Sequence, residues 1–411
     1  MNIWIFNHYA VGPNSNGITR HFDLAKELVK LGHRVTIFAS SFNHQKRLEE
    51  KEYKRKELFK KEVYNNVNFY WIKTTPYKKN DIKRIKNMLS YTVRAFFTVK
   101  KVEETPDIVI GSLMHPLAAL LGYYVANKYK AKFYFEERDL WPQSLIDLGK
   151  VSPQNPLVKI LSKLELFLYK KADKIIVLFD KAPNYVVSRG IDSKKVIYLP
   201  NGISLERYKS NNGNLPEELQ KVFANYQDKF LIVYTGAHSL ANYLEAVLDI
   251  ALMVQKRTNN IQFLLIGDGP AKNLLIKKAT MEGIKNVKFL PPVEKEYIPS
   301  LLKRADAGII ALKNLEVYKW GISLNKMYDY MAAGVPIIMF TSLKNNVVSD
   351  NGLGIVSECK ETLVNKIIEL SENREMAKKI AQKGYNYVIK YHTWEELSKK
   401  LSCEMTKDFF N

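Results

Sequence analysis

The chain has 411 residues, 46% of them hydrophobic, and a formal net charge of +21 at pH 7. This length predicts two domains of roughly 200 residues, and the charge calls for an acidic partner such as a nucleotide, a nucleic acid or an anionic lipid surface. The two cysteines lack zinc-ligand spacing and no run of about 18 apolar residues occurs, so we expect a cytosolic protein without a metal framework or a membrane span.

Apolar runs and helical patterns alternate through the first half of the chain. Short buried strands separated by helices indicate a parallel, doubly wound sheet with helices on both faces. The predicted strands are 2–6, 34–39, 107–111, 132–136, 174–178 and 196–199, and the predicted helices are 19–31, 117–129, 156–171 and 183–189.

The second half repeats this scheme with strands 230–236, 262–267, 287–290, 307–312 and 335–339, and with helices 243–256, 271–281, 296–304 and two more from 361 and 374. The predicted fold class is therefore α/β, with two doubly wound, Rossmann-like domains facing across a cleft. We place the domains at 1–202 and 203–385, with a C-terminal helix in 386–411 that packs back on the first domain. The ligand is expected in the cleft, at the carboxyl ends of the strands.

Residues 323–338 read as a helix start, a short helix and a buried strand. Ser323 and Asn325 lie at the helix start, where backbone amides favour a phosphate, and the first turn adds the ammonium of Lys326. Asp329, one turn later, is placed to accept hydrogen bonds from ribose hydroxyls. The alternative is an ordinary amphipathic helix closed by a glycine and a proline.

The interval 44–101 carries 17 Lys or Arg residues against 6 acids, about half of the excess charge. A basic segment with apolar anchors fits the anionic face of a bilayer, and the alternative is a solvated lysine-rich surface. The interleaved apolar residues are Tyr53, Phe59, Tyr64, Phe69, Tyr70, Trp71, Met88, Leu89, Tyr91, Phe96 and Phe97.

Several short motifs occur in a fixed order along the chain. They are Asn16-Gly-Ile-Thr-Arg20, Glu137-Arg-Asp-Leu-Trp-Pro142, Leu199-Pro-Asn-Gly-Ile203, Tyr234-Thr-Gly-Ala-His238, Gly267-Asp-Gly-Pro270, the 323–338 segment and Tyr391-His-Thr-Trp394. Together they resemble the family 4 retaining glycosyltransferases, which have the two-domain GT-B architecture. The branch that resembles the chain most builds bacterial surface polysaccharides with amino sugars.

The resemblance implies a retaining enzyme of the hexosyltransferase type that uses a UDP-linked, N-acetylated amino sugar. The implied acceptor is a lipid-linked (polyprenyl-diphosphate) sugar or an oligosaccharide in capsule or O-antigen synthesis. Neither a metal nor another cofactor is implied, and the protein would lie in the cytoplasm, peripherally on the inner face of the cell membrane. The oligomeric state stays open.

The chain departs from this family at two places. The family's motif is an acid followed, after seven intervening residues, by a second acid. Asp329 stands at the position of the second acid. Gly321 stands at the position of the first, where the usual acid contacts the donor sugar. The family's Arg and Lys after the first strand of the second domain are also missing behind Gly236, and Lys326 is the candidate replacement.

Further candidate residues follow other strands. Gly17 and Arg20 are placed for a phosphate, although Gly17 also fits a tight turn. Gly236 offers loop amides to the pyrophosphate. His238 either assists there or forms a loop hydrogen bond.

Gly267, Gly269 and Val293 are placed beside the base or ribose. His115 follows a strand and either binds a sugar hydroxyl or starts a helix. Arg138 belongs to a charged triplet that either contacts the ligands or holds the following Trp-Pro turn.

Lys326, Asp329, His115 and Arg138 are thus the predicted catalytic residues. Two other functions remain as alternatives. A nucleotide-sugar epimerase could use the same double-domain plan, but it would need acids and histidines for proton transfer. The net charge alone also fits a non-catalytic nucleic-acid-binding protein, although no recognisable binding motif for nucleic acid occurs.

Overall fold

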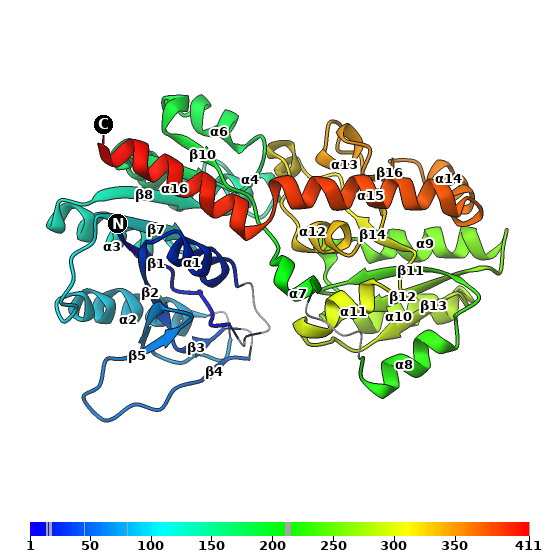
Figure 1. Cartoon of the computed structure of the whole chain (residues 1–411), viewed down its shortest axis with the longest axis horizontal. Coiled ribbons are helices and arrows are strands. Elements are labelled where there is room, and N and C mark those ends of the chain that lie inside the picture. Colours follow the sequence, from blue (N-terminus) through cyan, green and yellow to red (C-terminus); the bar gives the residue numbers. More distant parts are fainter. Residues whose placement is uncertain (14, 16–18, 45, 80, 210–214, 411) are drawn as a thin grey trace. The chain divides into compact units, whose positions relative to one another are not determined.

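The computed structural model describes residues 1–13, 15, 19–44, 46–79, 81–209 and 215–410, and these form two α/β units (Figure 1). Unit 1 comprises Met1–Asn201, Lys319–Ser323 and Trp394–Asn411, and unit 2 comprises Gly202–Tyr318 and Leu324–Thr393. The first boundary lies one residue before the predicted 202/203 boundary. A five-residue piece from the second half of the sequence belongs to unit 1.

Unit 1 contains an eight-stranded sheet in the order β10-β9-β8-β7-β1-β2-β6-β5. All neighbouring strands are parallel except the edge pair of β5 and β6, a hairpin that the sequence analysis missed. The strands are β1 (Asn2–Phe6), β2 (Arg34–Ser40), β5 (Phe59–Tyr64), β6 (Val67–Ile72), β7 (Ile108–Leu113), β8 (Lys132–Glu137), β9 (Lys174–Val177) and β10 (Val196–Tyr198), beside a small pair of β3 (Phe42–Asn43) and β4 (Leu48–Glu49).

Helices cover both faces of this sheet because β1, β2 and β7 are apolar on both sides. One core layer lies under α1 (Arg20–Lys30) and α16 (Trp394–Phe410). The other lies under α2 (Ile82–Val99), α3 (Pro116–Tyr129), α5 (Pro156–Lys171) and α6 (Ala182–Ser188). The short α4 (Gln143–Asp147) and η1 (Ser193–Lys195) complete the unit.

The C-terminal helix of the predicted 386–411 segment begins later than expected. Helix α15 (Arg374–Tyr391) of unit 2 continues through the predicted start, and only α16 joins unit 1. The buried side chains of α16 that pack in the α1 layer are Trp394, Leu397, Leu401 and Met405.

Unit 2 contains a parallel six-stranded sheet in the order β13-β12-β11-β14-β15-β16. Numbered from β11, this is the strand order 3-2-1-4-5-6 of dinucleotide-binding folds, which confirms the predicted doubly wound sheet. The strands are β11 (Phe230–Thr235), β12 (Ile261–Ile266), β13 (Val287–Leu290), β14 (Ala307–Ala311), β15 (Ile337–Phe340) and β16 (Gly354–Ser357).

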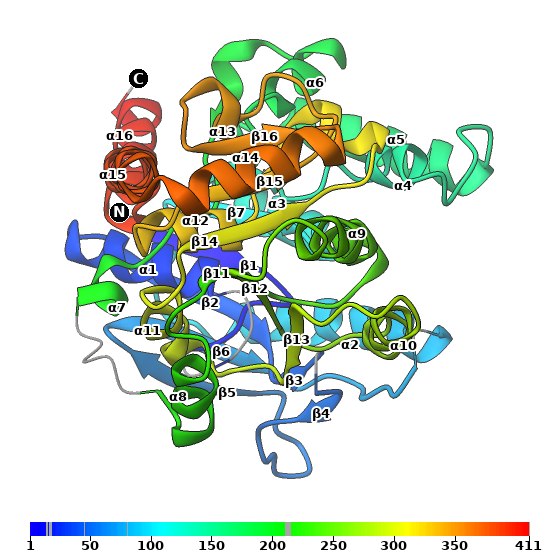
Figure 2. The same ribbon diagram turned by 90° about the vertical axis from the view of Figure 1, so that its right-hand side faces the viewer.

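Helices α9 (Leu244–Gln255) and α14 (Lys360–Glu372) lie side by side over the main core of this sheet (Figure 2). Helix α12 (Asn325–Ala332) packs against α15, where Gly384 lies beside Met331. The remaining helices are α7 (Leu205–Lys209), α8 (Glu217–Ala224), α10 (Lys272–Met281), α11 (Ile298–Leu302) and α13 (Val347–Asp350), with the short turns η2 (Leu240–Asn242), η3 (Lys295–Tyr297) and η4 (Glu316–Trp320).

Four of the eleven apolar anchors expected in the 44–101 segment are not available to a membrane. Phe69, Tyr70, Trp71 and Tyr91 are buried, because β6 and α2 turn these side chains into the core of unit 1. Of the eleven residues, only Leu89 and Phe97 count among the exposed large hydrophobic side chains. Throughout the described ranges, no helix combines the length and the apolar composition needed to cross a bilayer.

Candidate active site

The strongest candidate site in unit 2 lies where the strand order reverses, between β11 and β14. Open α/β sheets bind ligands at this switch point, beyond the carboxyl ends of the strands. Gly236 directly follows β11, and α12 begins after the connection from β14. The Nζ atom of Lys326 lies 3.2 Å from where a Cβ atom on Gly236 would stand, so the two predicted phosphate-binding segments meet.

Lys326 is held by neutral groups. Its Nζ donates to the Tyr234 hydroxyl at 2.8 Å and to the Asn242 Oδ1 at 3.1 Å, and it lies 4.0 Å from the centroid of the Tyr234 ring. No carboxylate of the described chain forms an ion pair with it. Burial lowers the pKa of Lys326 to about 7, so a nearby anion would stabilise its charged form.

The N-terminus of α12 adds a second feature that favours an anion. Leu324 occupies the N-cap position and its side chain cannot accept a hydrogen bond from the first-turn amides. The exposed Asn325 is the first residue of the helix. A helix start without a side-chain cap and a half-buried lysine in its first turn form an arrangement suited to a phosphate.

Asp329 lies one turn further along α12. Its Oδ1 accepts a hydrogen bond from the Tyr208 hydroxyl at 2.7 Å. Burial raises the pKa of Asp329, and the bond from Tyr208 partly offsets this effect. Asp329 is therefore held in place by a residue of α7, and its predicted contact with ribose stays a prediction.

We expect Tyr208→Phe to lower the free energy of unfolding by about 1–3 kcal/mol at pH 7, because it leaves a buried carboxylate without its donor. The pKa of Asp329 should rise further, so the loss should shrink at acidic pH, where Asp329 is protonated. Urea unfolding at pH 7 and pH 4 measures both effects. Tyr226→Phe, which removes a hydroxyl elsewhere in unit 2, is the control; equal losses in the two variants would contradict the assignment.

Gly267 and His238 form the neighbouring wall. A Cβ atom on Gly267, whose φ is +149°, would overlap the carbonyl oxygen of Gly236, so only glycine allows the two loops to touch. The His238 side chain is fully buried, and neither ring nitrogen has a hydrogen-bond partner among the described atoms. Burial and then the charge of Lys272 lower the pKa of His238 to about 4, so the ring is neutral at pH 7.

The other residues predicted for the donor are spread along this edge or beyond it. Gly269 belongs to the same loop as Gly267, and the half-buried Val293 follows β13. Ser323 belongs to unit 1, where its Oγ and carbonyl oxygen accept hydrogen bonds from Asn201 at 3.0 and 3.1 Å. Ser323 was predicted to lie at the N-terminus of α12. It lies before the helix instead, so this prediction is wrong.

Arg20 has a different environment from the one predicted. It is 1% exposed, and its guanidinium donates to Glu136 at 3.0 Å and to the carbonyl oxygens of Pro200 and Leu199 at 2.6 and 2.8 Å. These bonds occupy the side chain inside unit 1, so we replace the predicted phosphate contact by a structural role. Gly17 lies outside the described residues.

Glu136 is the centre of this buried network. Its Oε2 lies 2.6 Å from both His21 Nε2 and Ser112 Oγ. Burial alone would raise the pKa of Glu136, but the charges of His21 and Arg20 outweigh it and hold the pKa well below its usual range. The network joins β7, β8 and α1 at the carboxyl edge of the sheet, and the sequence analysis did not identify it.

His115 occupies the N-cap position of α3, in line with the structural alternative considered for it. It is 3% exposed, and its Nε2 lies 2.8 Å from His8 Nδ1. Burial and the charge of Arg84 lower the pKa of His115 to about 3. A neutral, buried imidazole bonded to another histidine is a poor general acid, so its predicted catalytic role has no support from this placement.

The charged triplet Glu137-Arg138-Asp139 begins at the last residue of β8, and its first two side chains have different environments. The Glu137 carboxylate accepts a hydrogen bond from the backbone of Trp141 at 2.9 Å and another from Tyr169, which favours the structural alternative for this residue. Arg138, in contrast, lines a cavity of about 210 Å³, and its buried Nε has no described partner. Other residues of this cavity include Tyr9, Ser41, His44, Glu50 and Trp71.

The backbone at position 321 disfavours the first acid of the family pattern. Its φ is +97°, and a Cβ atom there would overlap the carboxylate of Asp180. The neighbouring Trp320 is fixed in unit 1 by its carbonyl oxygen, which accepts from the Lys181 amide at 3.2 Å, and by its indole, which donates to Asp147 at 3.2 Å. A side chain at position 321 would therefore be strained by the left-handed backbone and would have to displace the carboxylate of Asp180.

Two doubly wound units of this kind define a GT-B fold, the architecture of a large class of glycosyltransferases. The family Glycosyltransferase Family 4 matches residues 15–207, and Glycosyl transferases group 1 matches residues 216–387. Because these two matches together cover most of the chain, it belongs to the glycosyltransferases that combine a family 4 domain with a group 1 domain. Family membership favours a transferase over the nucleic-acid-binding alternative.

Individual relatives are distant. The chain is 22% identical over 241 residues to WcaI of Escherichia coli K12, named as a glycosyl transferase of colanic acid biosynthesis; the match covers 58% of this chain and 59% of the relative. Among solved structures it resembles sucrose-phosphate synthase of Thermosynechococcus elongatus, with a TM-score of 0.71, 14% identity and coverage of 100% and 99%. It also resembles Anabaena HepE in complex with UDP-glucose, with a TM-score of 0.68, 13% identity and coverage of 99% and 100%. These structural similarities establish the fold alone.

The sequence analysis missed the residues that hold the predicted ones in place. Tyr234 and Asn242 bind Lys326, and Tyr208 binds Asp329. Tyr234 lies in a continuous apolar strand, and Tyr208 lies more than a hundred residues from its partner. Neither has a local pattern that distinguishes it from an ordinary core residue.

Proposed function

We propose that the protein transfers a sugar from a UDP-linked donor to a lipid-linked or oligosaccharide acceptor in bacterial surface-polysaccharide assembly. The observation that supports this proposal most strongly is Lys326, a half-buried ammonium with neutral partners in the first turn of α12. A diphosphate would supply the missing negative charge. The UDP-glucose complex of HepE and the name of WcaI support the donor type and the pathway class.

In the proposed reaction, the bond between the sugar C1 atom and the phosphate oxygen breaks, and its electron pair leaves with UDP. The acceptor oxygen forms the new bond to C1, and its proton passes to the departing phosphate oxygen. In a retaining enzyme both events occur on one face of the sugar. Lys326 and the amides at the start of α12 would neutralise the developing charge on UDP without a metal ion.

The remaining donor contacts follow from the same edge of unit 2. The unpaired, neutral imidazole of His238 is placed to exchange hydrogen bonds with a phosphate or ribose oxygen. Asp329 would accept from ribose hydroxyls through its second oxygen. The transferred sugar would be an N-acetylated amino sugar.

For the acceptor, the cavity of unit 1 is the best candidate in the described chain. It combines aromatic rings, hydroxyls and a carboxylate with Arg138, and this mixture is typical of sites for sugars. Arg138 would bind a hydroxyl or a phosphate of a lipid-linked acceptor. The enzyme would act in the cytoplasm at the inner face of the membrane.

The experiment is a thermal-shift and turnover assay with a panel of UDP- and GDP-linked sugars, run with and without membrane lipid extract. A UDP-sugar at 100 times its Kd should stabilise the protein by about 2.7 kcal/mol, and its sugar should appear in the lipid fraction. Sugar interconversion without an acceptor would indicate the epimerase instead. If no nucleotide stabilises the protein and no sugar is consumed, the proposal is wrong.

A further inference from the structure

The outward face of α2 is apolar, the reverse of an ordinary surface helix. The exposed residues recur every three or four positions, which places them on one stripe, whereas the inward face buries polar residues such as Asn87 and Thr98. The stripe consists of Ile82 (68% exposed), Ile85 (55%), Leu89 (47%), Val93 (53%) and Phe97 (46%).

Helix α5 repeats this pattern. Leu157 is 61% exposed, Ile160 is 62% exposed and Phe167 is 37% exposed, again at helical spacing. The inward side of α5 buries Leu168 and Tyr169 in the core of unit 1. Both helices therefore have a core-facing side and, in addition, apolar side chains directed at solvent.

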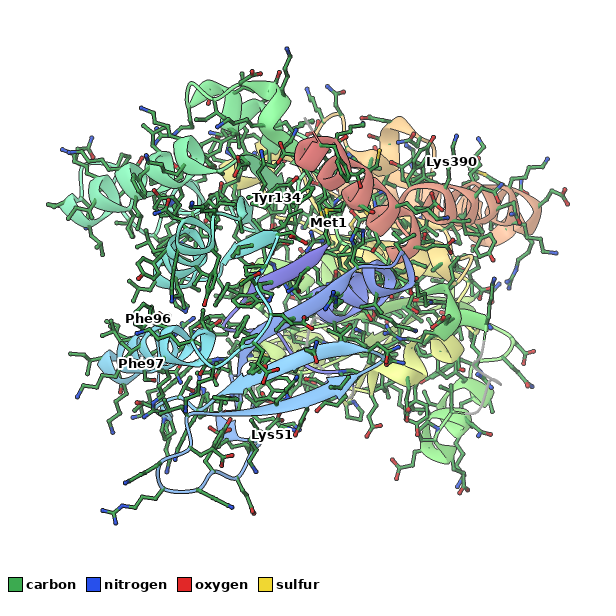
Figure 3. The ribbon with its side chains drawn as sticks, turned by 60° about the vertical axis from the view of Figure 1, so that its left-hand side comes forward. Met1, Lys51, Phe96, Phe97, Tyr134 and Lys390 are labelled. Carbon is green, nitrogen blue, oxygen red and sulfur yellow. The ribbon has the colours of Figure 1, made fainter. Side chains whose placement is uncertain are left out.

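Aromatic contacts through α3 join the two stripes. Phe96 lies beside Phe97 on α2, with ring centroids 5.4 Å apart (Figure 3), and contacts the half-exposed Tyr124 at 5.5 Å. On the other side of α3, Tyr123 contacts Phe167 of α5 at 5.4 Å. We call the resulting surface the apolar face; its exposed members are Ile82, Ile85, Leu89, Val93, Phe97, Tyr124, Leu157, Ile160 and Phe167.

The charges on these three helices have one sign. Their sequences contain nine cationic residues, four on α2, one on α3 and four on α5, and a single acid, Glu165. Glu165 is buried, accepts a hydrogen bond from the Tyr185 hydroxyl at 2.7 Å and forms an ion pair with Arg189 at 3.1 Å. The solvent-facing cations at or beside the apolar face are Lys83, Lys86, Lys128, Lys159, Lys163, Lys170 and Lys171.

We infer that the apolar face docks the protein on an anionic lipid bilayer, with α2 and α5 lying in the plane of the membrane surface. Exposed Ile, Leu, Val and Phe side chains fit the acyl boundary, and lysines around them fit anionic headgroups. Nucleic acid offers no apolar surface to these side chains. A second copy of the chain would bring the same lysines together, so like charges disfavour self-association.

The inference deepens the proposed function. It rests on that function because a lipid-linked acceptor gives the enzyme a reason to approach a membrane. It replaces the broad 44–101 segment by α2, α3 and α5, because β6 directs its aromatic residues into the core. Its test needs neither donor nor acceptor, so its failure and the failure of the proposed function are distinguishable.

The test is co-sedimentation of the full chain with vesicles of equal parts phosphatidylcholine and phosphatidylglycerol, compared with pure phosphatidylcholine. We expect binding to the anionic vesicles that falls as salt rises. Leu89→Ser/Val93→Ser should weaken binding at least tenfold, because several methyl and methylene groups no longer enter the interface. Lys163→Gln/Lys170→Gln should weaken it roughly 25-fold, about fivefold for each lysine.

The control is Leu274→Ser/Met281→Ser, which removes two exposed apolar side chains of α10, 65% and 84% exposed, and should leave binding unchanged. The thermal shift with UDP should be the same in all variants. Absence of binding to anionic vesicles, equal binding to both vesicle types, or equal loss in the α10 control would each overturn the inference. So would light scattering that finds the wild type dimeric and the α2 variant monomeric.

Discussion

Lys326→Met should slow sugar transfer by about 10²–10³-fold and weaken UDP binding by about 10- to 100-fold, because it removes a half-buried cation in the first turn of α12. Methionine keeps an apolar stem of similar length, so the packing against Tyr234 is largely retained. Steady-state kinetics and calorimetric titration with UDP measure the two effects. Lys277→Met, which removes an exposed cation of α10, is the matched control and should change neither quantity.

The same substitution should stabilise the free protein by about 1–3 kcal/mol at pH 6, since an apolar side chain replaces a desolvated cation without a counter-charge. The pKa of Lys326 in the folded wild type, about 7, lies below the ordinary lysine value of 10.5. The cost of burying the charge is therefore complete below pH 7 and is lost as pH rises, because the folded protein then releases a proton that the unfolded chain retains. The advantage of Lys326→Met should thus shrink between pH 7 and pH 10.

Proton uptake separates this site from a merely structural lysine. At pH 8 the free protein holds Lys326 largely neutral, and a bound diphosphate should raise its pKa and recharge it. Calorimetry of UDP binding in buffers with different ionisation enthalpies should therefore report uptake of up to one proton in the wild type and none in Lys326→Met. Unchanged UDP affinity in the variant would exclude Lys326 from the donor site.

The fold was largely predictable because buried parallel strands are short, continuous apolar runs. Strands such as 287–290 and helices such as 156–171 have the predicted bounds. The prediction missed α2, because its exposed face is apolar and its inner face is partly polar, so the usual periodic signal is reversed. It also missed β5, an antiparallel edge strand whose three consecutive charged residues, Lys60, Lys61 and Glu62, break any apolar run.

The candidate site was predictable only for residues with a positional signal. Gly236 directly follows a strand, Lys326 lies in the first turn of a helix, and the two meet as expected. Arg20 also follows a strand, but a buried carboxylate from β8 takes up its guanidinium, and no local pattern reveals such a long-range ion pair. The division of Ser323 from Asn325 between the two units likewise depends on tertiary packing.

Gly321→Glu, which would restore the acid of the family pattern, should instead destabilise unit 1 by about 2–3 kcal/mol and lower its Tm by roughly 5–10 °C. The left-handed backbone disfavours any side chain, and the new Cβ would overlap the carboxylate of Asp180, an exposed residue whose side chain would have to move and would then lie beside a second carboxylate. Thermal unfolding measures the loss. Gly149→Ala in the same unit, with φ +68° and open space around the Cβ position, isolates the backbone term and should cost about 1 kcal/mol.

Asp180→Gly should separate the overlap from the backbone strain. If the Asp180 carboxylate fills the space of the missing side chain, the double variant Gly321→Ala/Asp180→Gly should be more stable than the sum of the single effects predicts, by about 1–3 kcal/mol. Additive effects would contradict the steric explanation. A Gly321→Glu variant that folds normally and transfers sugar faster than the wild type would mean that the first acid is compatible with this chain, and that Asp180 yields its place to the new side chain.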